Sequence, residues 1–210
     1  MKRDRLLQEL TELHRTKRTA IRRRLKDFAS IPASEYFYEL LYCLLTPQTS
    51  AVNADKTIAK LKEVRFEARN LNPEPFLADK RHYIRFHKTK SKHLLKLKAE
   101  IQTVQSVLSN DASSNELREW LVKNIYGLGY KEATHFLRNI GKNDGLAILD
   151  RHILRNLQRY GAIRSLPETL SRKQYLSIEK KFMSFAQQIN IPIDELDLLF
   201  WSMETGEIRK

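Results

Sequence analysis

The chain has 210 residues, 41% of them hydrophobic, which is enough to bury a core as one domain or as two small lobes and excludes a disordered tail. Lys and Arg number 38 against 25 Asp and Glu, and the formal net charge of +13 favours an anionic partner such as nucleic acid or an acidic membrane surface. The single cysteine, Cys43, excludes an intrachain disulfide and a cluster held by several cysteines, and its apolar surroundings predict a buried residue.

The amino terminus is charged and is not followed by an apolar run, so we expect no signal peptide. No stretch approaches the roughly 18 consecutive apolar residues of a membrane-spanning helix. The sequence therefore predicts a cytoplasmic protein that makes no use of a membrane.

Apolar residues recur every three or four positions, and there are only 6 Gly and 6 Pro, a pattern typical of an all-α protein. The first predicted helix covers residues 4–28 and has a basic face, which is more often solvated than bound. Further helices are predicted over residues 34–45, 51–64 and 91–108. The polar residues 113–115 predict the start of a helix that ends at about 124, and a turn separates it from another helix that ends at about 140. The last three helices are predicted to begin at residues 150, 172 and 193.

Two glycines one residue apart, Gly127 and Gly129, join two of these helices in the sequence Ile-Tyr-Gly-Leu-Gly-Tyr-Lys. Glycine permits a positive φ and the close approach of another backbone. Amides at such a turn and at the start of the following helix can hold a phosphate without reading a base. Taken alone, however, an ordinary glycine connection between helices explains this pattern more simply.

Lys131 opens the helix after this turn, and Asp150 follows 19 residues later, where an apolar run meets a predicted helix start. Alone, Asp150 is explained by helix capping and Lys131 by solvation. Together, the glycine turn, Lys131 and the spaced Asp150 resemble the signature of the helix-hairpin-helix DNA glycosylase superfamily, which contains endonuclease III and the 8-oxoguanine glycosylases.

A second segment, Leu-Leu-Thr-Pro-Gln-Thr-Ser-Ala-Val-Asn-Ala over residues 44–54, is similar to the superfamily segment in which a glutamine enters the duplex where the flipped nucleotide stood. This resemblance implies that Gln48 is that wedge. Endonuclease III itself is disfavoured, because its iron–sulfur cluster needs four cysteine thiolates and the chain has one cysteine.

The carboxyl-terminal sequence over residues 196–210 resembles that of the small type-2 8-oxoguanine DNA glycosylases of archaea and some bacteria, as do residues 83–87 and 127–141. In that family an aromatic pair stacks on the extruded base and the terminal residue closes the pocket. The resemblance therefore implies substrate-binding roles for Phe86, Trp201 and Lys210. Core packing for the aromatic residues and a frayed tail for the lysine are the simpler explanations from composition.

The resemblance implies a monomeric, bifunctional DNA glycosylase/AP lyase that excises 8-oxoguanine from double-stranded DNA in base excision repair. Lys131 would attack C1′ of the extruded nucleotide and form a Schiff base whose β-elimination nicks the strand. Asp150 would either stabilise positive charge on the sugar or activate the nucleophile, and both roles stay open. Gly127, Gly129 and Tyr130 would hold the DNA backbone.

The resemblance also implies two helical lobes flanking a cleft. A middle lobe over residues 50–140 would carry a helix-hairpin-helix motif at about 117–140, and residues 1–49 with 141–210 would form the second lobe. A structural Na⁺ or K⁺ would bind carbonyl groups of the hairpin, those of Lys123, Ile125 and Leu128, with no other cofactor and no metal held by side chains.

Three alternatives remain at this point. A related glycosylase for another lesion would share the hairpin and Lys131, because these residues contact backbone and sugar rather than base. A noncatalytic module would hold DNA without cleaving it. A basic helical scaffold with no DNA partner would show no steep loss of DNA affinity with salt.

Overall fold

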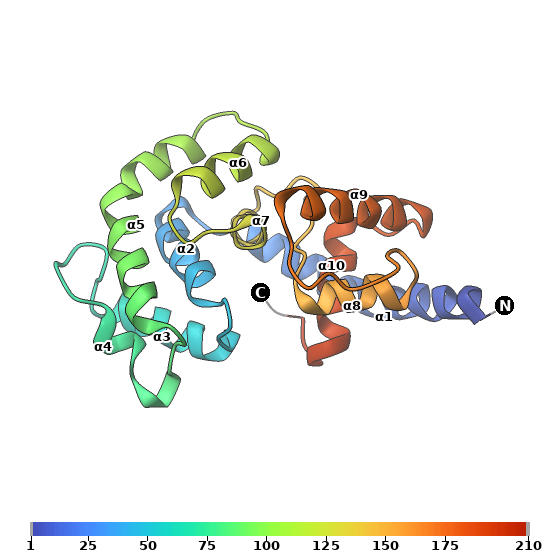
Figure 1. The fold of residues 1–210 in the computed structure, drawn as a ribbon, viewed down its shortest axis with the longest axis horizontal. Helices are drawn as coiled ribbons and strands as arrows, with labels where there is room; N and C mark the ends of the chain where they lie inside the picture. The colour runs from blue at the N-terminus through green and yellow to red at the C-terminus, as the bar shows by residue number, and fades with distance from the viewer. Residues whose placement is uncertain (1, 209–210) are drawn as a thin grey trace. The chain divides into compact units, whose positions relative to one another are not determined.

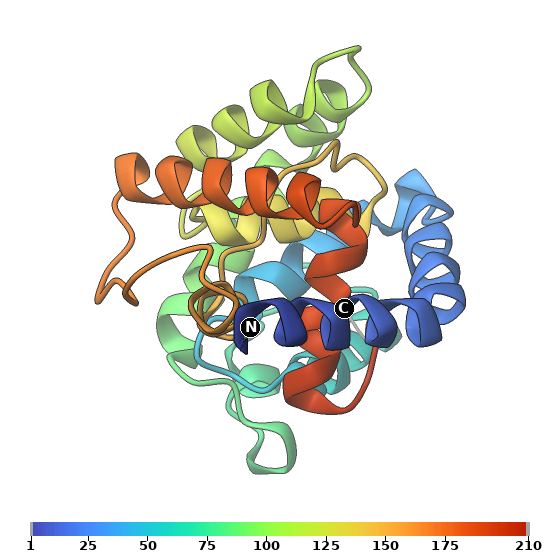
Figure 2. The same cartoon turned by 90° about the vertical axis from the view of Figure 1, so that its right-hand side faces the viewer.

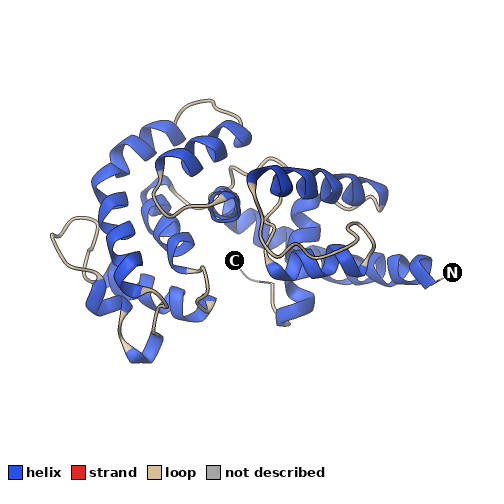
Figure 3. Cartoon of the chain, viewed as in Figure 1, coloured by secondary structure: helices blue, strands red, loops and turns tan. Residues whose placement is uncertain are grey.

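The structure is a computed structural model that describes residues 2–208. Over these residues it contains ten α-helices, two 3-10 helices and no strand (Figure 3). The all-α fold class predicted from the spacing of apolar residues is therefore confirmed. Every helix in this range is too short or too polar to cross a membrane.

The helices pack into two compact units. The terminal unit comprises Met1–Ser30 with Gly141–Lys210, and the internal unit comprises Ile31–Ile140. The sequence had suggested a first boundary at residue 50. The structure places it at residue 31, because α2 (Tyr36–Leu45) packs against helices of the internal unit.

The internal unit is built around α2, of which all residues from Phe37 to Leu45 are buried. This helix packs against α3, α5 and α7 (Figure 1), and Cys43 lies in the resulting core with 0% of its surface exposed, as predicted. The further elements of the unit are α3 (Ala51–Glu63), α4 (Glu74–Leu77), α5 (His87–Leu108), α6 (Ser114–Asn124) and α7 (Tyr130–Asn139), with 3-10 turns at Ala33–Glu35 and Lys80–His82.

The terminal unit contains α1 (Lys2–Ala29), α8 (Arg151–Arg159), α9 (Arg172–Gln188) and α10 (Ile193–Thr205). Helix α10 packs against the other three, and Figure 2 shows α1 crossing it. Glu195 on α10 is buried and accepts hydrogen bonds from His14 Nε2 at 2.6 Å and Arg22 Nε at 2.7 Å. Burial raises the pKa of Glu195, but these two bonds outweigh that effect and leave the pKa below its ordinary value. The carboxylate therefore ties α1 to α10.

Short polar residues begin several helices, as predicted for residues 113–115. Ser113 forms a capping box with Glu116 at the start of α6, and Ser171 forms one with Gln174 at the start of α9. The predicted start of α5 at residue 91 is wrong, since the helix begins at His87, directly after Phe86 in a left-handed conformation.

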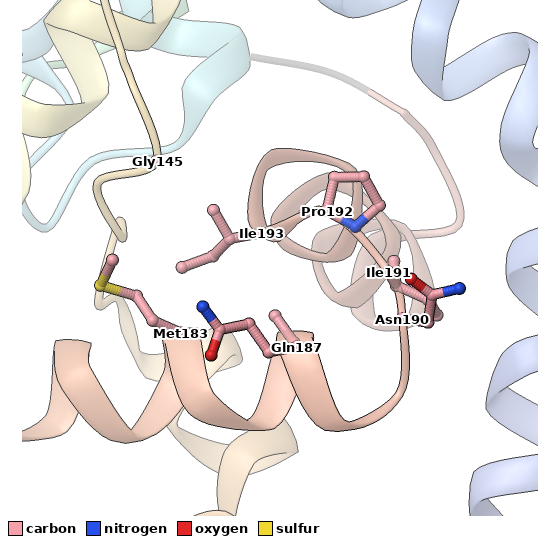
Figure 4. Close-up of a pocket in the computed structure, with 8 residues that line it drawn as sticks. Gly145, Met183, Gln187, Asn190, Ile191, Pro192 and Ile193 are labelled. Atoms are coloured by element: carbon pink, nitrogen blue, oxygen red, sulfur yellow. The ribbon is translucent and has the colours of Figure 1, made fainter.

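One groove of the terminal unit, of about 290 Å³, lies between the chain at Gly145 and the turn from α9 to α10. Figure 4 shows Met183 and Gln187 on α9 reaching toward Ile193 at the start of α10. No charged side chain lines this groove. It therefore offers no group for acid–base or nucleophilic chemistry.

Candidate active site

The connection between α6 and α7 is a tight hairpin that requires glycine at residue 127. Gly127 has a φ of +88°, in the left-handed region where other residues are strained. A Cβ atom on this glycine would lie 2.2 Å from Nδ1 of His93 on α5. The amide of Leu128 closes the turn by donating to the carbonyl of Ile125 at 3.2 Å.

Gly129 forms the start of α7. Its backbone is extended, and it offers no side chain that could cap the helix. The first amides of a helix have no acceptor within it, and the helix dipole makes this end electropositive. A groove of about 340 Å³ beside it is lined by Lys96 and residues 122–129. This end of α7 is therefore suited to a phosphate group.

Tyr130 joins the two helices of the hairpin. Its hydroxyl donates to Oε2 of Glu119 on α6 at 2.6 Å, and the guanidinium of the buried Arg118 lies 5.4 Å from the centre of its ring. These contacts tie the start of α7 to α6.

Lys131 is the second residue of α7, and 24% of its side chain is exposed. Its Nζ lies 3.7 Å from Oε1 of Glu132. The residues that follow, from Ala133 to Asn139, are all buried and anchor the helix. Lys131 is thus carried on a rigid element, with its amine partly shielded and still open to solvent.

Asp150 belongs to the terminal unit, where it caps α8. Its Oδ1 accepts a hydrogen bond from the amide of Ile153 at 2.8 Å, so the capping explanation of this residue is correct. The chain before it is held by the hydroxyl of Tyr175, which donates to the carbonyl of Ala147 at 2.5 Å and accepts from the amide of Leu149 at 3.2 Å. A carboxylate has two oxygens, so capping with one leaves the other able to act in chemistry.

Gln48 lies in the loop between α2 and α3, at residues 46–50. Its side chain is exposed, and its φ is +54°, which is uncommon for a residue other than glycine. Such a conformation costs about 1–3 kcal/mol and persists when the surrounding structure imposes it. Ser50 ends the loop as the cap of α3, accepting from the amide of Asn53 at 3.2 Å.

The two predicted aromatic residues belong to different units. Phe86, in the internal unit, is 50% exposed, and the guanidinium of Arg85 lies 4.9 Å from its ring centre. Trp201, on α10 of the terminal unit, packs against His152 with ring centres 5.0 Å apart. The indole Nε1 of Trp201 is buried and has no hydrogen-bond partner among the described residues. Lys210 lies outside the described residues.

The carbonyl groups predicted to hold a monovalent cation belong to Lys123, Ile125 and Leu128 of the hairpin. The carbonyl of Ile125 already accepts from the Leu128 amide, but an oxygen with two lone pairs can also contact a cation. Among the described residues, no group of three or more His, Cys, Asp and Glu side chains could hold a metal. The cation at the hairpin stays a prediction.

Comparison with known proteins assigns the chain to a family. The family model described as 8-oxoguanine DNA glycosylase matches residues 21–191. The chain belongs to the 8-oxoguanine DNA glycosylase family. A curated relative, the 8-oxoguanine DNA glycosylase/AP lyase of Fusobacterium nucleatum, is 38% identical, and the alignment covers 100% of both chains. The enzyme of the same name from Methanocaldococcus jannaschii is 32% identical over 98% of this chain and 99% of its own.

Solved structures of the 8-oxoguanine DNA glycosylase family have the same fold. That of the Methanocaldococcus jannaschii 8-oxoguanine glycosylase/lyase in complex with 15mer DNA containing 8-oxoguanine matches with a TM-score of 0.86 at 32% identity, over 98% of this chain and 99% of that one. The 8-oxoguanine DNA glycosylase of Thermotoga maritima matches with a TM-score of 0.85 at 27% identity, over 99% and 100%.

Sequence reasoning missed one buried charge beside the Gln48 loop. Lys90 on α5 is 5% exposed, and its ammonium lies under this loop. A signal for it exists in the sequence, since Lys90 lies four residues before Leu94 and seven before Leu97 on the buried face of the helix. Three other lysines between residues 88 and 96 obscure that signal.

Proposed function

We propose that the chain is a bifunctional DNA glycosylase/AP lyase that flips 8-oxoguanine out of double-stranded DNA, excises it and nicks the strand in base excision repair. Full-length relationship to curated enzymes of that name is the observation that carries this function. The hairpin geometry supports it, because a lysine follows directly on a backbone turn suited to a phosphate. Since the substrate is chromosomal DNA, we place the activity at the nucleoid, in the cytoplasm of a bacterium or archaeon.

The first step is extrusion of the damaged nucleotide. A stacked base cannot present its glycosidic carbon to a nucleophile, and unstacking it costs a few kcal/mol. The amides of Gly127, Gly129 and Tyr130 hold the DNA backbone, while Gln48 fills the gap that the nucleotide leaves. A cation on the hairpin carbonyls would add positive charge next to the phosphate.

The second step is attack by Lys131. Its neutral amine forms a bond to C1′ as the bond from C1′ to the base breaks, and the base leaves with the electron pair and takes up a proton. Opening of the sugar converts the adduct to a Schiff base. Loss of a proton from C2′ then expels the 3′ phosphate by β-elimination, which nicks the strand. Asp150 supports this step by offsetting positive charge on the sugar or by accepting a proton.

In this proposal Phe86, Trp201 and Lys210 bind the extruded base, as the family resemblance implies. The buried indole Nε1 of Trp201 supports a role in recognition, because a buried donor without a partner gains from meeting an acceptor.

A panel of duplexes tests the substrate. Each duplex carries one defined lesion, either 8-oxoguanine opposite cytosine, an oxidised pyrimidine, or adenine opposite 8-oxoguanine, and release of the free base is measured under single-turnover conditions. We expect fast release of 8-oxoguanine and slow release of the others. Preferential release of another base would replace the proposed substrate, and salt-sensitive binding without any release would indicate a noncatalytic module.

A further inference from the structure

The ammonium of Lys90 makes a closed set of hydrogen bonds to the Gln48 loop. Its Nζ donates to the carbonyl of Leu45 at 2.7 Å, to the carbonyl of Pro47 at 2.7 Å and to Oγ1 of Thr49 at 3.1 Å. An ammonium has three donors, so these three acceptors satisfy it completely. Lys90 reaches them from α5, more than 40 residues further along the chain.

The positions of the three acceptors fix the course of the loop. Leu45 is the last residue of α2, where a cation complements the open carbonyls and the helix dipole. Pro47 and Thr49 directly precede and follow Gln48. The lysine thus holds the end of the helix and the chain on both sides of Gln48, but leaves the glutamine side chain exposed.

The backbone of Gln48 needs such support. Its left-handed φ of +54° is disfavoured for glutamine, because a residue with a Cβ atom is strained in this region whereas glycine is not. The turn itself contributes, because the amide of Thr49 donates to the carbonyl of Thr46 at 3.0 Å, and Lys90 adds a bond to each neighbour of Gln48. The clamp and the strained residue therefore belong together.

We propose that Lys90 is a positioning residue for base extrusion, which holds the loop over residues 46–50 so that Gln48 is presented to the duplex. The proposal rests on the function proposed above, in particular on Gln48 as the wedge. Lys90 acts through Gln48 and contacts neither the base nor the sugar.

An electrostatic effect on Lys131 is the competing explanation. Burial lowers the pKa of Lys90 to about 8, Glu132 acts in the opposite direction, and the charge of Lys131 lowers it further. The charged and titratable groups that face Lys90 are therefore Lys131 and Glu132 on α7, with His93 on its own helix. If Lys90 acted on the nucleophile, its removal would slow abasic-site cleavage as much as excision, whereas the loss of a loop clamp would slow mainly the excision of a paired base.

The test is a double-mutant cycle on the full-length protein. Single-turnover excision of 8-oxoguanine is measured for wild type, Lys90→Met, Gln48→Ala and the double variant, on duplexes with the lesion opposite cytosine or opposite an abasic analogue. Lys92→Met, which removes an exposed charge from the same helix, is the matched control. The pH profile of abasic-site cleavage is recorded for wild type and Lys90→Met.

We expect Lys90→Met to slow excision of the paired lesion about tenfold or more, with the double variant no slower than the slower single variant. The defect should shrink opposite the abasic analogue, because unstacking costs less when the base is unpaired. Abasic-site cleavage should slow far less than excision, although its pH profile shifts because the charges of Lys90 and Lys131 act on each other. Multiplied defects in the double variant, an equal defect on both duplexes, or an equal loss in abasic-site cleavage would each overturn the proposal.

A milder pair of variants keeps the test decisive if Lys90→Met does not fold. Thr49→Val removes one acceptor and Thr49→Ser keeps it, so only the valine variant should slow excision of the paired lesion, by about two- to fivefold for one lost hydrogen bond. Equal rates for both variants would overturn the proposal. If wild type releases no 8-oxoguanine, the proposed function fails; if it does but Gln48→Ala is as fast, the wedge and this inference fail together.

Discussion

Two short loops of the internal unit, the hairpin at residues 125–129 and the Gln48 loop at residues 46–50, reach unusual backbone conformations in different ways. The hairpin uses glycine at the position with positive φ. The Gln48 loop places a glutamine in such a conformation, within a turn that the Thr49 amide closes on the Thr46 carbonyl, and the ammonium of Lys90 ties this turn to a distant helix. A conformation encoded by the residue itself can be recognised in a sequence, whereas one imposed by a remote side chain requires the structure.

The largest effect is expected for Gly127→Ala. The added Cβ would meet the ring of His93 at 2.2 Å in a left-handed conformation that alanine disfavours, so the hairpin should open. We expect a loss of about 2–4 kcal/mol in the free energy of unfolding, from the strain together with the overlap. DNA affinity at low salt should fall with it, which chemical denaturation and fluorescence anisotropy would measure.

Gly206→Ala is the matched control, because Gly206 has a φ of +80° and no atom within 4 Å of an added Cβ. The free energy of unfolding of this variant should fall by about 1 kcal/mol, the cost of a left-handed backbone without any steric overlap. Equal destabilisation by the two substitutions would show that the approach of His93 does not constrain the hairpin.

A smaller, pH-dependent effect is expected for Lys90. Its pKa is lowered from 10.5 to about 8 in the folded protein, so between these pH values the unfolded chain binds more protons and folding stability rises with pH. From pH 8 to 10.5, wild type should gain about 5–10 °C in unfolding midpoint relative to Lys90→Met, because a pKa difference of this size amounts to roughly 2–3 kcal/mol. Thermal melts across this range measure the difference. A constant difference would mean that Lys90 is not desolvated as described.

The smallest effect on stability is expected for Gln48→Gly, which relieves the left-handed strain but adds freedom to the unfolded chain. The free energy of unfolding should change by less than about 1 kcal/mol, while excision of paired 8-oxoguanine slows. Asn190→Gly, at a φ of +53° outside the proposed site, should match it in stability and leave excision unchanged. Unaltered excision by the Gln48 variant would remove the glutamine from the mechanism.

Much of the fold was predictable because its signals are local. Apolar spacing predicted the helices, the polar residues 113–115 predicted the start of α6, and the paired glycines predicted the turn before Lys131. Asp150 shows the limit of this reasoning, because capping of α8 accounts for its sequence position whether or not it also serves catalysis.

What escaped prediction depends on contacts between distant residues. Lys90 is one of several lysines in its segment, and only the packing of α5 on α2 shows which one is buried. The left-handed Phe86 moved the start of α5 by four residues, since no glycine marks that position. The boundary at residue 31 likewise follows from the packing of α2, which its own sequence does not specify.

Borohydride trapping on a duplex with 8-oxoguanine opposite cytosine tests the central claim most directly. Wild type, Lys131→Gln and Lys173→Gln, which changes an exposed lysine of α9, are compared for covalent adduct and strand cleavage. The account predicts an adduct and a nick with wild type and Lys173→Gln, and neither with folded Lys131→Gln, because only a Schiff base is reduced to a stable link. Undiminished trapping by Lys131→Gln would show that another amine is the nucleophile and would contradict the account.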